Sequence, residues 1–295
     1  MAAAYTGVSP TEVIVGAGAD EVLDIVAKAC LPAGSLALVP IPTYAMYGVL
    51  TSQRAARVLA VPRLPAADGF RLDVDAVCAR LPEVSVAWLC TPNNPTGAAD
   101  TGADVERVLE AAAALPMPPV VVVDEAYFEF TGQTFVERRE RYPNLLCVRT
   151  VSKAFGLAGV RVGWAVGARP LIARLERVRP PGSVSTISTT LAAAALRQPA
   201  YARDNAARLS AERDWLAAEL AALGWPSPPS VANFLLVRIG DHAAADGAAE
   251  HLLRSGIVPR TFGPANPLRG HLRLTVRSRS ENERLLEVVR GWHAA

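Results

Sequence analysis

The segment Val120-Val-Val-Val-Asp-Glu-Ala-Tyr127 decides the fold, because a wholly apolar run ends abruptly in two carboxylates and a tyrosine. A strand without polar residues on either face is buried on both faces, as in parallel sheets covered by helices. Similar runs recur at residues 13–15, 36–39, 58–61, 86–90, 145–148 and 162–166. Between them, apolar residues recur at helical spacing over 20–30, 74–81 and 105–114. The pattern predicts an α/β fold, with a large domain whose mostly parallel central sheet is covered by helices.

The pattern changes near residue 200. A long charged helix is predicted over 201–223, and the segment Gly224-Trp-Pro-Ser-Pro-Pro229 ends it. Strands are then predicted at 234–239 and 272–276, with helices at 243–255 and 281–292. We therefore expect a large ligand-binding domain over 1–200, followed over 201–295 by an interdomain helix and a smaller C-terminal α+β domain.

Composition narrows the class of protein. The chain has 295 residues, 51% of them hydrophobic, and its net charge of +2 argues against nucleic acid or an anionic membrane as a partner. No apolar run approaches the roughly 18 residues of a membrane helix. The four cysteines lack metal-ligand spacing, so we expect no metal site and no disulfide framework. The first residues do not resemble a secretory leader, so we expect a cytoplasmic protein.

Ligands of doubly wound sheets bind beyond the carboxyl ends of the strands, so the residues that follow each strand matter most. Gly16-Ala-Gly-Ala-Asp-Glu21 lacks the last glycine of a dinucleotide fingerprint. Its helix N-terminus could bind a phosphate, or Asp20 could simply cap the helix. Tyr44, in Pro40-Ile-Pro-Thr-Tyr44, could cover a flat ligand or lie in a surface turn.

Three further strand ends carry reactive or polar groups. Thr91-Pro-Asn-Asn-Pro-Thr-Gly97 contains two prolines that fix the backbone and two asparagines, which is more than a simple turn requires. We therefore expect both amide side chains to point outward and to have a function. Asp124, after four buried valines, needs a cationic partner. Lys153, among small and apolar residues, is expected to lose proton affinity, which suits Schiff-base chemistry, although alone it could be a surface lysine.

Taken together, these segments resemble the fold-type I pyridoxal-phosphate aminotransferases of class II, and within them the histidinol-phosphate aminotransferase branch. Thr150-Val-Ser-Lys-Ala-Phe-Gly-Leu-Ala-Gly159 fits the class II lysine-attachment motif at every position. The other matching motifs occur in the family's order, namely Gly18-Ala-Asp-Glu21, Pro42-Thr-Tyr44, Pro92-Asn-Asn-Pro-Thr-Gly97, Asp124-Glu-Ala-Tyr127 and Leu272-Arg-Leu-Thr-Val276. The resemblance covers nearly the whole chain and implies pyridoxal 5′-phosphate as the cofactor.

The resemblance also implies roles for individual residues. Lys153 would bind the cofactor aldehyde and move the proton, and Asp124 would pair with the ring nitrogen. Tyr127 and Asn94 would bind the ring oxygen, and Tyr44 would stack on the ring. The phosphate would be held by Ala19, Asp20, Thr150, Ser152 and Arg161. Arg273 would bind the substrate carboxylate. Arg260 would bind a substrate phosphate, with a surface salt bridge as the equal alternative.

The implied reaction transfers an amino group from histidinol phosphate to 2-oxoglutarate, in histidine biosynthesis. Alternatives on the same scaffold are an aromatic aminotransferase, a threonine-phosphate decarboxylase and an inactive truncated homologue. The missing glycine disfavours a nicotinamide dehydrogenase. The resemblance implies a homodimer, and an N-terminal arm that would precede the segment beginning near Tyr5. From the lack of that arm we expect weak cofactor binding, a tendency to aggregate and slow or absent transamination.

Overall fold

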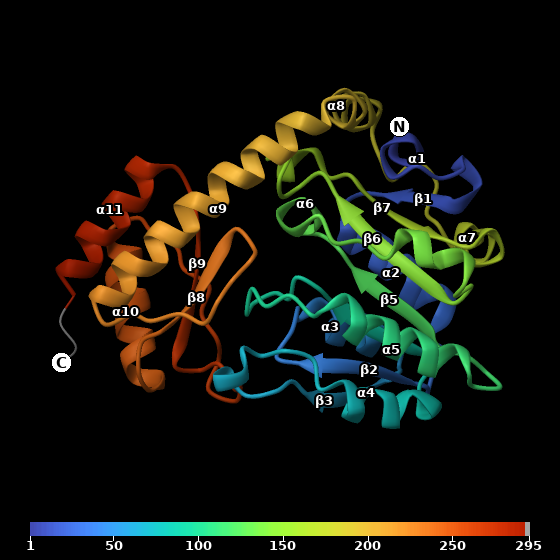
Figure 1. Ribbon diagram of the computed structural model, residues 1–295, viewed down its shortest axis with the longest axis horizontal. Coiled ribbons are helices and arrows are strands. Elements are labelled where there is room, and N and C mark those ends of the chain that lie inside the picture. The colour runs from blue at the N-terminus through green and yellow to red at the C-terminus, as the bar shows by residue number, and fades with distance from the viewer. Residues whose placement is uncertain (293–295) are drawn as a thin grey trace.

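A seven-stranded mixed sheet forms the centre of the larger part of the molecule (Figure 1). The computed structural model describes residues 1–292, so the last three residues of the predicted 201–295 part lie outside the described residues. The spatial order is β1-β7-β6-β5-β4-β2-β3. The strands span Val13–Gly16 (β1), Leu36–Ile41 (β2), Arg57–Pro62 (β3), Val86–Cys90 (β4), Val120–Asp124 (β5), Leu145–Thr150 (β6) and Gly163–Gly167 (β7).

The five strands from β2 to β6 are parallel to their neighbours, whereas β7 runs antiparallel to β6 and β1 antiparallel to β7. The predicted mostly parallel sheet is therefore confirmed. β6 and β7 are joined by a short loop and one 3₁₀ turn, Ala158–Val160, instead of a crossover helix. An antiparallel pair allows such a connection, because its strands meet at the same end.

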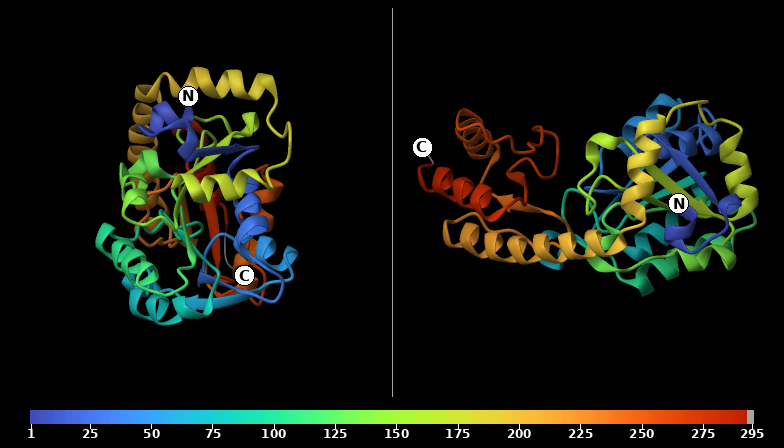
Figure 2. Two further views of the ribbon diagram at one scale, coloured as in Figure 1. Left: turned by 90° about the vertical axis from the view of Figure 1, so that its right-hand side faces the viewer. Right: turned by 90° about the horizontal axis from the view of Figure 1, so that it is seen from above.

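Helices cover both faces of this sheet (Figures 1 and 2). The helices of this part span Ala2–Thr6 (α1), Ala19–Cys30 (α2), Met46–Gln53 (α3), Val74–Arg80 (α4), Gly102–Ala113 (α5), Phe128–Thr131 (α6), Arg169–Glu176 (α7) and Thr186–Leu196 (α8). The remaining 3₁₀ turns lie at Pro10–Glu12, Ala66–Asp68, Leu81–Glu83 and Val136–Glu140.

The four valines of the central strand β5 pack against apolar layers on both faces of the sheet. Val121 and Val123 belong to the apolar cluster that includes α4 and α5. Val120 and Val122 belong to the cluster on the other face, with residues of α2, α3 and α7. Alternate residues of a strand point to opposite faces, so a strand that is covered on both faces needs an apolar residue at each of these four positions.

The smaller part is built on a two-stranded antiparallel sheet, which confirms the predicted α+β character. Its elements are α9 (Pro199–Ala222), β8 (Phe234–Arg238), α10 (His242–Arg254), β9 (His271–Thr275) and α11 (Arg279–Arg290). Figure 1 shows α9 running from the larger part along the smaller one. A separate apolar cluster, including Leu216, Leu235, Leu272 and Leu286, forms its core. Across residues 1–292, no helix has both the length and the apolar character that crossing a bilayer requires.

Candidate active site

All ten residues that the sequence assigns to cofactor binding line one cavity, which encloses about 570 Å³ of empty space with its open mouth included. They are Ala19, Asp20, Tyr44, Asn94, Asp124, Tyr127, Thr150, Ser152, Lys153 and Arg161. Cys90, Ala126 and Ala158 also line this cavity and were not predicted. Although the residues lie far apart in the sequence, the fold brings the whole set together.

Strand register explains the convergence. Cys90 at the end of β4 pairs with Asp124 at the end of β5, and Asp124 pairs with Val148 on β6. These parallel strands end at one edge of the sheet, so the segments that follow them surround the same space.

Asp124 lies at the floor of the cavity and is only 4% exposed. Burial raises the pKa of its carboxyl to about 6. Two donors and one charge oppose this rise: the Tyr47 hydroxyl at 2.7 Å, the Ala126 N–H at 3.1 Å, and Lys153. Within residues 1–292 no cationic side chain lies at ion-pair distance from Asp124, so the protein chain itself does not supply the predicted cationic partner. A protonated ring nitrogen is a group that could complete the site.

Lys153 follows β6 and is partly buried, so it is not a surface lysine. Burial lowers the pKa of its amine, and the positive charge of Arg273 lowers it further. Its Nζ lies 5.4 Å from the centre of the Tyr127 ring. A lysine with reduced proton affinity can act as a nucleophile toward an aldehyde and can accept a proton.

The N-terminus of α2 forms one end of the cavity. The helix begins at Ala19 with Gly18 as its N-cap and without a side-chain cap, so the alternative in which Asp20 caps it is wrong. Instead, the Asp20 carboxylate accepts from the Tyr44 hydroxyl at 2.9 Å and from Arg161 at 3.4 Å. Gly18 has φ +86°, and a Cβ there would lie 2.5 Å from Arg161 Nη2. Glycine thus lets this cation approach the helix N-terminus, an arrangement suited to a phosphate.

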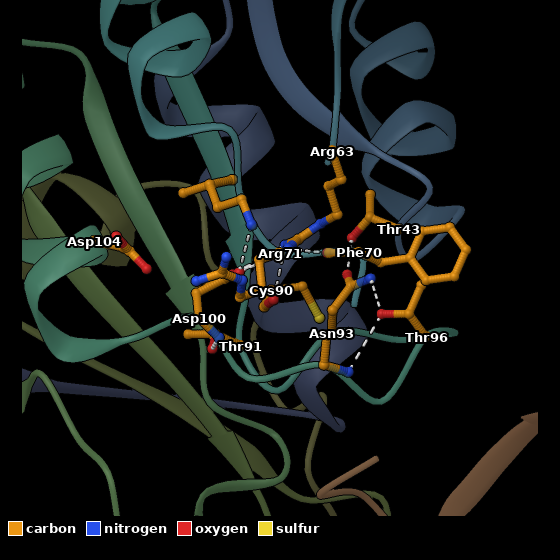
Figure 3. A network of polar contacts seen from close by, with 12 residues as sticks. Thr43, Arg63, Phe70, Arg71, Cys90, Thr91, Asn93, Thr96, Asp100 and Asp104 are labelled. Atoms are coloured by element: carbon orange, nitrogen blue, oxygen red, sulfur yellow. Dashed lines mark hydrogen bonds and ion pairs between the residues drawn. The ribbon is translucent and has the colours of Figure 1, made fainter. Parts of the chain in front are cut away.

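The segment after β4 is held rigidly, as Figure 3 shows. Asn93 is fully buried, accepts from the Thr43 hydroxyl at 2.7 Å and donates to Thr96 at 2.8 Å. Only Asn94 reaches the cavity, so the expectation that both amides point outward is wrong for Asn93. Neighbouring Asp100 binds the buried Arg63 side chain through both guanidinium nitrogens Nη1 and Nη2.

The two arginines predicted to bind substrate lie in the smaller part, in a second cavity that shares Tyr44 and Asn94 with the first. Arg273 Nη1 donates to Asn94 Oδ1 at 2.6 Å, and its Nε is buried without a partner among the described residues. Arg260 is exposed and pairs with Arg273 through two 3.0 Å backbone hydrogen bonds. The predicted alternative, a surface salt bridge of Arg260, does not occur within residues 1–292.

Tyr47 is the most important residue that the sequence analysis missed. It is fully buried, and its ring stacks on Trp88 at 5.4 Å between centroids. Its position three residues after Tyr44, which ends a predicted ligand segment, was the available signal. Nothing in the sequence, however, showed that its hydroxyl meets Asp124.

The donor set fits pyridoxal phosphate. One end of the cavity offers a helix N-terminus, hydroxyls and a guanidinium to a phosphate, and the floor offers a carboxylate to a ring nitrogen. The same cavity presents an amine of lowered proton affinity, a tyrosine and an amide. Each group of the cofactor therefore has a matching side chain.

Comparison with known proteins agrees with this geometry. The family "Aminotransferase class I and II" matches residues 2–289. A histidinol-phosphate aminotransferase of Thermococcus gammatolerans is 36% identical, covering 97% of this chain and 77% of that protein. One of Xylella fastidiosa is 38% identical, covering 100% of this chain and 81% of that protein.

A solved structure is also similar. Histidinol-phosphate aminotransferase from Sinorhizobium meliloti, crystallised in complex with pyridoxal-5′-phosphate, superposes with a TM-score of 0.88. It is 28% identical, and the match covers 98% of this chain and 80% of that chain.

Proposed function

Because this chain belongs to the aminotransferase class I and II family, we propose that it is a pyridoxal-phosphate-dependent transaminase acting on histidinol phosphate and 2-oxoglutarate. The observation that carries the proposal is the convergence of all ten predicted cofactor residues on one cavity. Relatives named histidinol-phosphate aminotransferase, at 33–38% identity over nearly the whole chain, support the choice of substrate.

When bound, pyridoxal phosphate supplies an aldehyde for amines and a ring that accepts electrons. Lys153 would hold the cofactor aldehyde covalently until the substrate amine takes its place, and the freed lysine amine would then carry a proton between the substrate α-carbon and the cofactor. Its lowered pKa keeps more of the amine neutral and able to accept that proton. Asp124 would bind the ring nitrogen and hold a proton on it, which would preserve the electron-accepting character of the ring.

The remaining cavity residues orient the cofactor. Tyr127 and Asn94 bind the ring oxygen, and Tyr44 covers one face of the ring. The phosphate is held by the backbone of Ala19 and Asp20 and by the side chains of Thr150, Ser152 and Arg161. The helix N-terminus and the guanidinium both favour the negative charge of the phosphate.

The substrate arginines must serve two different molecules. Histidinol phosphate carries a phosphate ester where an amino acid carries its α-carboxylate, whereas 2-oxoglutarate carries carboxylates. The planar fork of Arg273 can bind either group with two parallel hydrogen bonds. Arg260, its backbone-paired neighbour, adds a second cation for the doubly charged phosphate.

The substrate proposal is tested by offering the loaded enzyme histidinol phosphate, phenylalanine or threonine phosphate, each with 2-oxoglutarate. We expect glutamate to form fastest with histidinol phosphate. Faster glutamate formation from phenylalanine would indicate an aromatic aminotransferase. Carbon dioxide release from threonine phosphate without glutamate would indicate the decarboxylase, and no turnover of any donor would indicate an inactive homologue.

We also propose that the chain acts as a cytoplasmic homodimer, divided into a cofactor-binding domain over 1–200 and a second part over 201–295. The separate apolar cluster of the smaller part supports the division. Ile187 and Leu191 are exposed one turn apart on α8, and this apolar spot supports a subunit contact, because contiguous exposed apolar surface marks protein–protein interaction sites. Sedimentation of the purified chain tests the dimer.

A further inference from the structure

Tyr47 contacts the carboxylate of Asp124 from the buried side of the site. Its hydroxyl donates to Asp124 Oδ2 at 2.7 Å, while the Ala126 N–H donates to the other oxygen, Oδ1. Tyr47 is 0% exposed and does not line the cofactor cavity, so it touches the carboxylate without touching the ligand. The parallel stack on Trp88, with 7° between the planes, fixes the ring and therefore the direction of the hydroxyl.

Other groups also face Asp124, from several elements. They are Asp20 on α2, Tyr44 before α3, Cys90 at the end of β4, Tyr127 before α6 and Lys153 after β6. Burial raises the pKa of Cys90 to about 12, so the thiol stays neutral near pH 7. Lys153 lowers the pKa of Asp124, whereas Asp20 raises it.

The Tyr47 hydroxyl differs from these groups because it donates a hydrogen bond to Asp124 at every working pH. Burial, together with the charge of Asp124, raises the pKa of Tyr47 well above 10, so it keeps its proton at every working pH. A neutral donor at 2.7 Å stabilises the ionised carboxylate and does nothing comparable for the protonated form.

We propose that Tyr47 is a positioning residue that keeps the Asp124 carboxylate ionised and aimed at the ring nitrogen of the cofactor. The inference rests on the proposed function, since it assigns Asp124 to that nitrogen. Without the hydroxyl, Asp124 should bind a proton about tenfold more tightly, the size expected for a lost hydrogen bond to a charged group. Below the pH at which Asp124 is ionised, the ring nitrogen loses its charged partner.

The test is the pH dependence of pyridoxal-phosphate affinity, measured by absorbance titration of the cofactor-free chain between pH 5 and 8. For the unmodified chain, affinity should fall below about pH 6, where Asp124 takes up a proton. Tyr47→Phe keeps the ring on Trp88 and removes only the hydroxyl. The midpoint, meaning the pH at which half of this fall in affinity has occurred, should therefore move up by about one pH unit. A cofactor analogue with carbon in place of the ring nitrogen should show no such difference between the two proteins.

Tyr142→Phe is the matched control. The Tyr142 hydroxyl also donates to a carboxylate, Glu106, at 2.7 Å, and the residue is 3% exposed, but it lies outside the cavity. Its removal should leave the midpoint unchanged. In an Asp124→Asn background, Tyr47→Phe should likewise cause no further shift, because the titrating group is already absent.

An unshifted midpoint in Tyr47→Phe overturns the inference, as does an equal shift in Tyr142→Phe or a shift that persists with Asp124→Asn. If Tyr47→Phe does not fold, 3,5-difluorotyrosine in place of Tyr47 provides a stronger donor, and the midpoint should then move down. No movement with that residue also overturns the inference. A wild-type chain that binds no pyridoxal phosphate at any pH would instead refute the proposed function.

Discussion

Asp100→Asn should strongly destabilise the cofactor-free chain, although it only replaces one carboxylate oxygen with an NH₂ group. Asp100 and Arg63 form an ion pair whose side chains are 1% and 0% exposed (Figure 3). Asp100 accepts from Arg63 Nη1 at 2.9 Å, from Nη2 at 3.2 Å and from the Leu72 N–H at 2.9 Å. Both oxygens of Asp100 therefore accept from donors that cannot reach water.

The magnitude follows from this geometry. Asparagine has no charge, and its NH₂ group would face at least one N–H donor where an acceptor is required. The buried Arg63 would keep its positive charge without a counter-charge. Removing one partner of a buried pair costs about 3–5 kcal/mol, a large fraction of a typical unfolding free energy of about 5–15 kcal/mol.

Urea unfolding of the cofactor-free chain measures this cost. The matched control is Asp75→Asn, because Asp75 pairs with Arg107 at 2.6 Å but both side chains are exposed, at 86% and 57%. That control should lose less than about 1 kcal/mol. If Asp100→Asn also loses less than about 1 kcal/mol, burial does not set the strength of this pair and the reasoning is wrong.

Four further outcomes follow, three from the site and one from Glu129, a carboxyl outside it. Asp124→Asn should retain pyridoxal phosphate in its absorbance spectrum yet lose most transaminase activity, because a neutral amide does not hold the ring nitrogen protonated. Arg273→Lys should raise KM for every donor and for 2-oxoglutarate, since an ammonium does not reproduce the two parallel hydrogen bonds of a guanidinium. Arg260→Ala should raise KM for phosphorylated donors selectively, and equal losses with unphosphorylated donors would remove it from the site. Burial raises the pKa of Glu129 to about 7 from 4.5, so the folded chain binds an extra proton between these values and loses stability as pH rises through them. Glutamine does not titrate, so the unfolding free energy of Glu129→Gln should rise relative to that of wild type by about 2 kcal/mol from pH 5 to pH 8, as measured by urea unfolding. Unfolding free energies that change with pH in parallel in the two proteins would contradict this.

The sequence predicted the sheet well because buried strands have strong patterns. For β4 the predicted and observed bounds coincide, and for β5 they differ only by the inclusion of Asp124. Helices with weaker patterns were not predicted. α8 is rich in Ser, Thr and Ala and buries only Ala192 and Leu196, while α3 spans eight residues and contains Gly48.

The site was predictable where chemistry follows a strand end. Asp124 comes directly after a run of buried valines, Asn94 and Lys153 lie in the loops that follow β4 and β6, and the topology of parallel strands places such residues together. The assignment of Arg273 needed the family resemblance, because nothing in its own strand indicates which cavity it faces.

Contacts that depend on side-chain direction between distant segments could not be predicted. The Tyr47–Asp124 hydrogen bond joins residues 77 positions apart, and the Arg63–Asp100 pair joins residues 37 positions apart. Each contact forms only because β3, β2, β4 and β5 lie in this order in the sheet, and the sequence pattern does not determine that order.

The central claim is that Lys153 binds pyridoxal phosphate covalently, and locating the attached cofactor on the chain tests it most directly. The chain would be incubated with the cofactor, reduced with borohydride, digested and mapped by mass spectrometry. The account predicts a pyridoxyl-phosphate adduct on the peptide containing Lys153 and its loss in Lys153→Ala. An adduct on another lysine, or an adduct that survives Lys153→Ala at the same level, would contradict it.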